Sequence, residues 1–345
     1  MEDMKKVLLI ATGGTIASGY TEDGLAPQIA AGALLRYVEE YRDFCRVDVQ
    51  EPFSLDSTNI YGRHWVELAG LIEKKYDAYD GFVICHGTDT MAFTAAALSY
   101  LIQNSRKPIV VTGAQKPIDL PVTDARTNLL DSLRFASDGR AHGVNIVFGG
   151  NVIAGTRAKK ERSKSYNAFS SINYPNIAVI RDGRIIFYIE DEDRINGQVT
   201  FYHTLNERIL LLKLVPGMDG TVLNRLFSGY DGVIIEAFGV GGFPDYGEIP
   251  FYSEIRRWMD AGKFVMMATQ VTHEGSDMEV YQVGKVIKEE FGLMEAYDMT
   301  LEATVTKAMW ALGQTKDPEV FRRLFYRTVN HDILLGEEQA SELPS

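Results

Sequence analysis

The hydrophobic pattern of the chain consists of short apolar runs that end in polar, glycine-bearing turns. The first run covers residues 7–11 and leads straight into Thr-Gly-Gly-Thr at 12–15. A run this short, apolar on both faces and rich in branched residues, is typical of a buried strand in a parallel sheet. The glycines permit a tight turn at the carboxyl end of the strand, which is where open α/β sheets bind ligands. The pattern therefore places the Thr15 hydroxyl on a sharp turn at the mouth of a site.

Strand-length apolar runs alternate with helical patterns through the first half of the chain. Between the runs, apolar residues recur at three- and four-residue spacing, which is the pattern of amphipathic helices that pack on a sheet. Strand, loop and helix repeated in this way indicate a doubly wound α/β domain. Strands are expected at 80–85, 108–112, 144–148, 177–180 and 184–189, and helices at 30–40, 65–76, 91–103 and 124–137.

A second α/β pattern begins near residue 208. Residues 230–235 repeat the apolar character of 79–84, and both runs end in glycine-bearing loops. Because 345 residues are too many for one ordinary hydrophobic core, we expect two α/β domains, a larger doubly wound sheet followed by a smaller α/β domain. The first domain is placed at 1–190, a polar linker at 191–207 and the second domain at 208–345, with helices at 250–261, 280–291, 299–312 and 318–326.

Composition narrows the class of protein. The chain has 35 basic and 47 acidic residues, which argues against nucleic acid as a general partner because phosphate binding needs a basic surface. No apolar stretch approaches the roughly 18–20 residues of a membrane span, so no membrane partner is expected. Cys45 and Cys85 sit beside apolar residues and are expected to be buried free thiols in a reducing compartment. The first residues do not resemble a signal peptide, so we expect a cytoplasmic protein.

A second polar turn, His-Gly-Thr-Asp-Thr at 86–90, follows another apolar run. A threonine hydroxyl is a poor nucleophile at neutral pH and needs a base, or a chain of hydrogen bonds that leads to one. Asp89 beside Thr88, with a lysine from another loop, would form a relay of hydroxyl, carboxylate and ammonium groups. The Arg-x-x-Lys segment that ends at Lys160 supplies a candidate lysine.

Each of these segments also has a purely structural interpretation. Residues 12–15 suit a turn that cradles a phosphate, although the third glycine of Gly-x-Gly-x-x-Gly and the Gly-Lys-Ser/Thr of a P-loop are absent. Residues 88–90 are suited to the N-cap of the next helix, and 159–162 to a solvated loop. A further polar segment, Asp-Ser-Thr at 56–58, could be an ordinary turn or cap. The six histidines lack the spacing of metal ligands and Gly-x-Ser-x-Gly is absent, so neither a metal site nor a serine–histidine triad is expected.

Two segments together resemble a known family. Residues 11–17 (Ala-Thr-Gly-Gly-Thr-Ile-Ala) and 86–92 (His-Gly-Thr-Asp-Thr-Met-Ala), in this order, are similar to the two signatures of bacterial-type L-asparaginases. The pair is far more specific than either segment alone, and the resemblance extends over nearly the whole chain. Further segments similar to the cytoplasmic type I branch of the family lie at 56–58, 155–160, 230–242 and 298–304.

The resemblance implies a reaction and its catalytic residues. L-asparagine and water would give L-aspartate and ammonia without a cofactor, and a minor glutaminase activity is compatible with the same site. Thr15 would attack the side-chain amide and form a β-aspartyl ester, while Thr88, Asp89 and Lys160 would form a second triad in the same pocket. Which threonine attacks first stays open. Lys160 can act as a base or as an electrostatic organiser, and a base that acts through Thr88 is the favoured interpretation.

The resemblance also implies substrate-binding residues, which are Asp56, Ser57, Thr58, Gly87 and Ala114. The first three, together with Asp89, would hold the α-ammonium and α-carboxylate of the substrate, because acidic groups suit an ammonium and hydroxyl or backbone donors suit a carboxylate. Backbone N–H groups near Thr88, and at Ala114, would stabilise the tetrahedral oxyanion.

Two features depart from the family pattern. Many relatives carry a tyrosine just after the flexible glycine loop, where this chain has Leu25, and the nearest tyrosine, Tyr20, is the candidate to assist the nucleophile. Some type I enzymes have an allosteric asparagine site that uses a basic residue and a cysteine in the neighbourhoods that here read Glu236 and Val271, so such a switch is not expected. The family assembles as homodimers or homotetramers, and we expect the same here.

Two other functions stay open beside hydrolysis. The amidase subunit of a tRNA-dependent amidotransferase shares this core, but it carries an extra domain before the Thr-Gly-Gly-Thr strand, which here starts at Val7. A non-catalytic amino-acid sensor would keep the pocket. Such a sensor would not need the hydroxyl, carboxylate and ammonium groups of Thr15, Thr88, Asp89 and Lys160 together.

Overall fold

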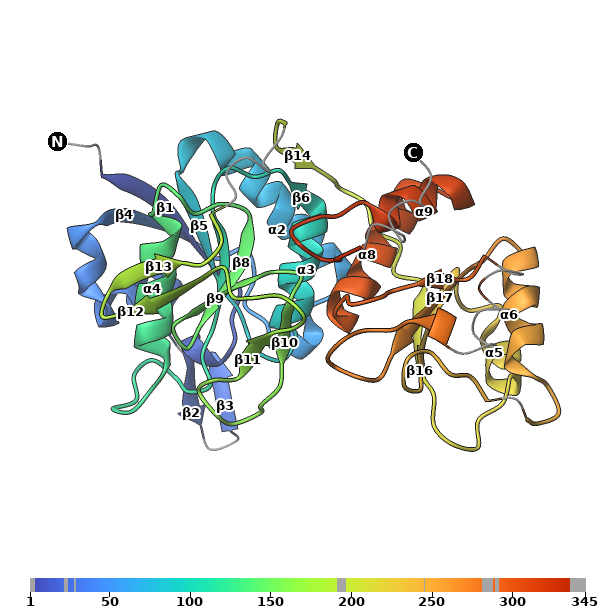
Figure 1. Cartoon of the computed structure of the whole chain (residues 1–345). Helices are drawn as coiled ribbons and strands as arrows, with labels where there is room; N and C mark the ends of the chain where they lie inside the picture. The colour runs from blue at the N-terminus through green and yellow to red at the C-terminus, as the bar shows by residue number, and fades with distance from the viewer. Residues whose placement is uncertain are drawn as a thin grey trace. The chain divides into compact units, whose positions relative to one another are not determined.

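The chain divides into two compact units, Met1–His203 and Thr204–Ser345 (Figure 1). Both units combine a β-sheet with helices, so the predicted α/β class is confirmed. The computed structural model describes residues 4–21, 24–27, 29–190, 197–244, 246–280, 288 and 292–335, with the backbone alone for 20, 21 and 24–27. Within these ranges no helix is both long enough and apolar enough to cross a membrane.

An eight-stranded sheet forms the centre of the first unit, in the order β13-β12-β9-β8-β7-β5-β1-β4. The pairs from β4 to β8 are parallel, whereas β9, β12 and β13 join by antiparallel pairing, so the sheet is mixed. The strands are β1 (Lys5–Ala11), β4 (Cys45–Gln50), β5 (Gly81–Cys85), β7 (Ile109–Thr112), β8 (Val144–Phe148), β9 (Asn151–Ala154), β12 (Ala178–Arg181) and β13 (Arg184–Phe187).

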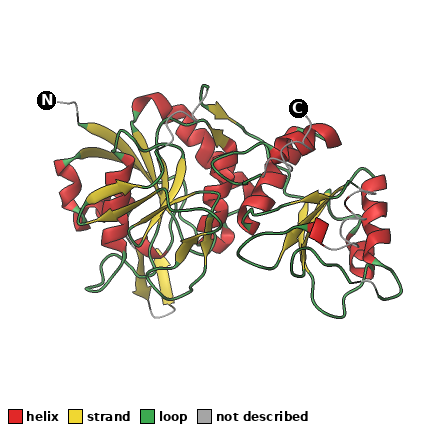
Figure 2. Cartoon of the chain, in the orientation of Figure 1, coloured by secondary structure: helices red, strands yellow, loops and turns green. Residues whose placement is uncertain are grey.

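The central strands are covered on both faces, which explains their continuous apolar runs. In β1 the five residues from Val7 onward are buried, and in β5 all five residues are buried. α4 (Ala125–Ala136) packs against β5, β7 and β8, while α3 (Met91–Leu101) lies against β7 and β8 from the opposite side and α2 (Gly62–Lys75) packs on α3 (Figures 1 and 2). Cys45 and Cys85 are buried free thiols in these layers, as predicted.

Short strand pairs complete the first unit. β2 (Ser18–Thr21) pairs with β3 (Gly24–Pro27), β10 (Ala158–Lys160) with β11 (Phe169–Ser171), and β6 (Ile102–Gln103) with β14 (Thr200–Phe201). β14 falls within the predicted linker 191–207, of which residues 191–196 lie outside the described ranges.

The prediction of one helix over residues 30–40 is wrong. The segment forms a single turn, α1 (Ala31–Leu34), followed by two 3-10 turns, Leu35–Tyr37 and Glu39–Asp43. Val38 separates the two 3-10 turns with φ −142° and ψ 43°, and its side chain is 1% exposed. Burial of this branched side chain in the core therefore outweighs helical continuity.

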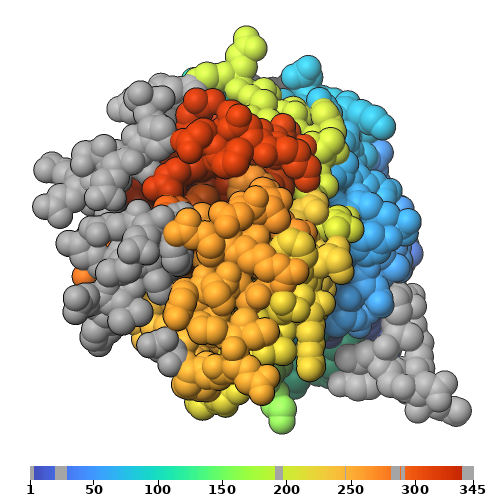
Figure 3. Space-filling view, turned by 90° about the vertical axis from the view of Figure 1, so that its right-hand side faces the viewer, coloured from blue at the N-terminus to red at the C-terminus, as the bar shows by residue number. Residues whose placement is uncertain are grey.

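The second unit is built on four parallel strands in the order β15-β16-β17-β18. Lys307 and Asp332, both fully buried, form an ion pair of 2.5 Å that connects α8 (Leu301–Gln314) to the segment after α9 (Pro318–Tyr326). In Figure 3 the yellow and orange segments, the latter including α6 (Phe251–Asp260), form one continuous face of this unit. The elements are β15 (Ile209–Lys213), α5 (Thr221–Leu226), β16 (Gly232–Ala237), α6 (Phe251–Asp260), β17 (Phe264–Thr269), β18 (Met294–Glu295), α8 (Leu301–Gln314) and α9 (Pro318–Tyr326). Most of the helix predicted at 280–291 lies outside the described residues.

Candidate active site

The turns that follow β1, β4 and β5 pack directly against one another. Thr12 N donates to Cys85 O at 3.0 Å, and Leu55 N donates to Thr12 O at 2.9 Å. Because the three strands are parallel neighbours, their carboxyl ends meet at one edge of the sheet. This edge brings together the predicted site segments 12–15, 56–58 and 86–90.

Two glycines allow these turns to approach so closely. Gly14 has φ 84° and ψ 174°, and a Cβ there would lie 2.4 Å from Gly87 N. A Cβ on Gly87 would in turn lie 2.6 Å from Ser57 Oγ. The backbone of Gly14 therefore packs directly on the backbone of Gly87. The 3-10 turn Thr15–Ala17 begins immediately after Gly14, and it places the partly exposed Thr15 side chain at the same edge of the sheet.

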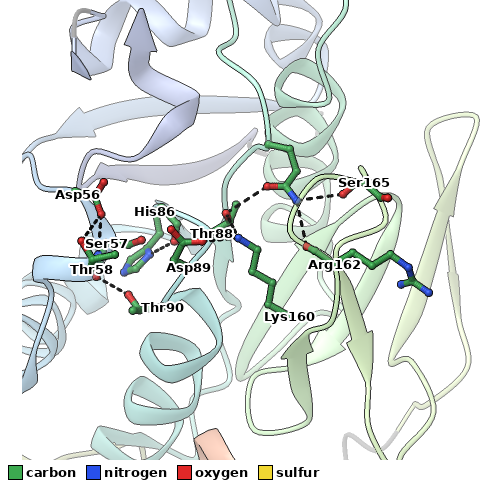
Figure 4. A network of polar contacts seen from close by, with 12 residues as sticks. Asp56, Ser57, Thr58, His86, Thr88, Asp89, Thr90, Lys160, Arg162 and Ser165 are labelled. Atoms are coloured by element: carbon green, nitrogen blue, oxygen red, sulfur yellow. Dashed lines mark hydrogen bonds and ion pairs between the residues drawn. The ribbon is translucent and has the colours of Figure 1, made fainter. Parts of the chain in front are cut away.

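The three residues of the predicted relay are joined by hydrogen bonds. Lys160, at the end of β10, donates from Nζ to Thr88 Oγ1 at 2.8 Å and to Asp89 Oδ1 at 2.6 Å (Figure 4). Thr88 is 7% exposed, whereas the Asp89 side chain is 62% exposed. A cation is thus held between a buried hydroxyl and a carboxylate that is open to solvent. An ammonium that donates to a hydroxyl oxygen fixes the orientation of that hydroxyl and polarises it for proton transfer.

Asp56, Ser57 and Thr58 lie beside this cluster (Figure 4), and Ser57 is next to Gly87, since a Cβ on Gly87 would meet Ser57 Oγ. Asp56 Oδ1 accepts hydrogen bonds from Thr58 N at 2.8 Å and Thr58 Oγ1 at 2.7 Å. These bonds lower the pKa of the Asp56 carboxyl below its usual range, so the group is a carboxylate at neutral pH. The segment therefore offers an anion and hydroxyl groups at one place, which suits both ends of an amino acid.

Gln115, which the sequence analysis did not single out, borders the cluster on its other side. Its Oε1 accepts from Thr88 Oγ1 at 3.4 Å, and its Nε2 donates to the carbonyls of Ser165 at 3.2 Å and Arg162 at 3.4 Å. The residue follows Ala114, which is 1% exposed at the turn after β7. Its place after a fourth strand end with a glycine turn was the signal that could have identified it.

His86 was not predicted as a site residue either, because the six histidines lack the spacing of metal ligands and no serine–histidine triad motif is present. The ring is fully buried, with Nδ1 2.7 Å from Gly87 O and Nε2 2.9 Å from Thr94 Oγ1. Burial lowers the pKa of the imidazole to about 4, so the ring is neutral at physiological pH. Among the described residues, no group of three or more His, Cys, Asp or Glu side chains is arranged to hold a metal ion.

Tyr20 belongs to the hairpin that follows the Thr15 turn. The β2–β3 register pairs the backbone of Tyr20 with that of Leu25. The side chains of both residues lie outside what the structure describes.

Comparisons with known proteins agree with this geometry. The family model "Asparaginase, N-terminal" matches residues 6–193, and "Glutaminase/Asparaginase C-terminal domain" matches 208–325. An L-asparaginase of Thermococcus kodakarensis is 38% identical over 95% of this chain and 99% of its own. A glutamyl-tRNA(Gln) amidotransferase subunit of Pyrococcus furiosus is 33% identical, over 92% of this chain and 74% of its own.

Solved structures give the same result. The thermostable L-asparaginase from Thermococcus kodakarensis superposes with a TM-score of 0.89 at 37% identity, covering 96% of this chain and all of that one. L-asparaginase I from Vibrio cholerae superposes with a TM-score of 0.86 at 28% identity, again over 96% and 100%. The chain therefore belongs to the bacterial-type L-asparaginase family, in its type I branch, and is an amidohydrolase.

Proposed function

We propose that this amidohydrolase converts L-asparagine and water to L-aspartate and ammonia, with Thr15 as the nucleophile. The observation that carries the proposal is the hydrogen-bonded set of Thr88, Asp89 and Lys160 at the sheet edge where the Thr15 turn packs on Gly87. A hydroxyl on a partly exposed turn and a polarised hydroxyl beside it are what amide attack by threonine requires.

The reaction proceeds in two halves. Thr15 Oγ attacks the side-chain amide carbon, the C–N bond breaks, and the proton from the Thr15 hydroxyl passes through Thr88 to the departing ammonia. Water then attacks the β-aspartyl ester, its proton returns to Thr15 Oγ, and aspartate leaves. Lys160 Nζ donates two hydrogen bonds, to Thr88 and to Asp89, which supports the role of an electrostatic organiser over that of a base.

The substrate is held by its α-groups. The carboxylates of Asp56 and Asp89 receive the α-ammonium, and the hydroxyl and backbone N–H of Ser57 receive the α-carboxylate. Thr58 contributes through Asp56, because its N–H and hydroxyl both donate to Asp56 Oδ1. Asp56 is kept ionised by Thr58, which supports this assignment. The list of binding residues is completed by Gly87 and Ala114, whose turns supply N–H donors for the oxyanion that forms at the amide carbon.

Tyr20 is proposed to assist the nucleophile. The backbone register of the β2–β3 hairpin, which places Tyr20 opposite Leu25 directly after the Thr15 turn, supports this role. A Tyr20→Phe variant is expected to lose turnover while Leu25→Val keeps it, as measured by ammonia release. Equal kcat in the two variants and the wild type would remove Tyr20 from the mechanism.

Substitution of Thr15 tests the nucleophile. Thr15→Ala is expected to lower kcat by at least about 10³-fold while the midpoint of thermal unfolding stays near that of the wild type. Thr200→Ala, which removes an exposed hydroxyl from β14, is the matched control and should keep full activity. A Thr15→Ala variant with near-normal kcat would refute the assignment.

Trapping the ester tests which threonine attacks. Rapid acid quenching during turnover, followed by peptide mass spectrometry, should find an added aspartyl group on the peptide that carries Thr15. The same group on the Thr88 peptide would reverse the two roles. Neither adduct in an active enzyme would contradict covalent catalysis.

The second candidate is an amidotransferase function, which the similarity to the amidotransferase chain of Pyrococcus furiosus favours. A steady-state ammonia assay with the isolated chain and asparagine or glutamine, without tRNA or another protein, separates the two. We expect ready hydrolysis of asparagine and a minor rate with glutamine. One methylene of difference is worth about 1–3 kcal/mol of discrimination. Absence of ammonia release would favour the amidotransferase.

The assembly, location and domain boundary are proposed with the same function. A homodimer or homotetramer in the cytoplasm, with a linker at 191–207, is what the family resemblance supports. Light scattering on the purified chain tests the assembly, since a monomer at enzyme concentrations that retain full activity would contradict it.

A further inference from the structure

A buried chain of hydrogen bonds runs from α2 to the turn that carries Thr88. Trp65 Nε1 donates to Thr94 Oγ1 at 2.9 Å, Thr94 Oγ1 lies 2.9 Å from His86 Nε2, and His86 Nδ1 lies 2.7 Å from Gly87 O. Trp65 is 5% exposed, and Thr94 and His86 are fully buried. Each of the four groups therefore has a hydrogen-bond partner within this buried chain.

The donors and acceptors in this chain have only one consistent direction. A carbonyl oxygen only accepts, so Nδ1 of His86 carries the proton that Gly87 O receives. A neutral imidazole carries one N–H, which leaves Nε2 as an acceptor for the Thr94 hydroxyl. An indole N–H only donates, and Thr94 Oγ1 accepts from it. If the His86 ring were protonated at both nitrogens, Trp65 Nε1 and His86 Nε2 would both donate to Thr94 Oγ1. The hydroxyl hydrogen of Thr94 would then lose His86 Nε2 as its acceptor.

This direction fixes the peptide between Gly87 and Thr88. All described peptide bonds are trans, so the N–H of Thr88 points opposite to the carbonyl of Gly87. Because that carbonyl is held towards the buried ring of His86, the Thr88 N–H points away from this ring. A backbone donor needs such a fixed aim to stabilise an oxyanion.

We infer that Trp65, Thr94 and His86 are positioning residues that lock the Gly87–Thr88 peptide so that the Thr88 N–H is preorganised for the oxyanion of the tetrahedral intermediate. The inference rests on the proposed amide hydrolysis. No atom of the three touches the substrate, and His86 takes no part in proton transfer. Loss of the lock affects the transition state and leaves the α-groups of the substrate bound as before, so kcat falls and KM does not change.

Steady-state ammonia release from asparagine by paired variants tests the lock. His86→Leu removes the donor to Gly87 O, and Thr94→Val removes the hydroxyl at constant shape. Each is expected to lower kcat about tenfold with unchanged KM, which is less than the 10²–10³-fold that follows removal of an oxyanion donor itself. His86→Asn keeps an N–H near the place of Nδ1, and Thr94→Ser keeps the hydroxyl, so both should recover most of the wild-type kcat.

The controls separate this inference from the proposed function. Ser99→Ala removes another buried hydroxyl from α3, one that donates to Ala95 O within its own helix, and should leave kcat unchanged. If wild type and Ser99→Ala release no ammonia, the proposed function fails. If they are active and Thr94→Val equals Thr94→Ser in kcat, the lock is refuted, even where His86→Leu does not fold. Nitrogen-15 NMR of the wild-type ring gives an independent answer, since a protonated Nε2 at pH 7 would overturn the direction of the chain.

Discussion

Replacement of Gly14 by alanine should weaken both the fold and the catalysis. The residue has φ 84° and ψ 174°, a region that is essentially reserved for glycine and costs other residues about 1–3 kcal/mol. The new Cβ would also lie 2.4 Å from Gly87 N and 2.6 Å from Gly87 Cα. Both atoms are backbone, so no rotamer change relieves the overlap, and such overpacking costs about a further 1–3 kcal/mol. We therefore expect a loss of about 2–6 kcal/mol in the free energy of unfolding.

The activity should fall beyond what this lost stability explains. The only way to accommodate the Cβ is to move the Gly87 turn away from the Thr15 turn, and Thr88 moves with Gly87. A displacement near 1 Å between reacting groups can cost on the order of 10²-fold in rate. Native domains have about 5–15 kcal/mol of stability, so the fraction of folded Gly14→Ala is taken from its urea curve and kcat is compared per folded molecule.

Urea unfolding and ammonia release, measured on the same preparations, test the reasoning. Gly70→Ala is the matched control, since Gly70 lies within α2 and a Cβ there would meet nothing within 4 Å. It should stabilise the protein by about 0.5–1 kcal/mol and leave kcat unchanged. A Gly14→Ala variant that unfolds at the urea midpoint of the wild type, or that keeps its kcat, would show that the two turns are not in the tight contact described.

Three further outcomes are expected. Lys160→Met should lower kcat by about 10²–10⁴-fold, because Thr88 loses its ammonium donor, and wild-type turnover would contradict the triad. Between about pH 6.5 and 4, the lowered pKa of His86 removes stability on acidification, whereas the pKa of Asp131, raised by burial to about 6, adds stability on acidification. The free energy of unfolding of His86→Asn minus that of wild type should thus rise between pH 7 and pH 4.5 in urea titrations, and the same difference for Asp131→Asn should fall. Equal pH slopes in variant and wild type would refute both assignments. Lys307→Met should lower the free energy of unfolding by about 3–5 kcal/mol, because the buried Asp332 loses the ammonium of its ion pair. The kcat per folded molecule should not change. A midpoint of thermal unfolding equal to that of wild type would refute this prediction.

The strands of the first unit could be read from the sequence because their burial on both faces is written in consecutive residues. β1 contains five consecutive buried residues and all five residues of β5 are buried, at the places where the apolar runs predicted strands. The segment around Val38 could not be read in this way. Its helical spacing is real, but the position of the core on which Val38 packs depends on strands that are distant along the chain.

The site divides along the same line. Lys160 could be predicted because a hydroxyl and a carboxylate on adjacent residues, Thr88 and Asp89, form a relay only with a nearby cation. In the structure Lys160 bonds to both, from 72 and 71 residues along the chain. Gln115 and Trp65 carry no such chemical demand. They reach Thr88 and Thr94 only through the spatial order of β1, β5, β7 and their helices, over separations of 27 and 29 residues.

The hydrogen bond between Thr88 and Lys160 has a consequence for the protein during its synthesis. Synthesis proceeds from the N-terminus, so a growing chain carries Thr15, then Thr88, long before it carries the lysine of β10. Parallel strands with long separations also pair late in folding. In the proposed mechanism a chain without Lys160 cannot polarise Thr88, so a nascent or prematurely released chain is expected to be catalytically silent until the first unit includes β10.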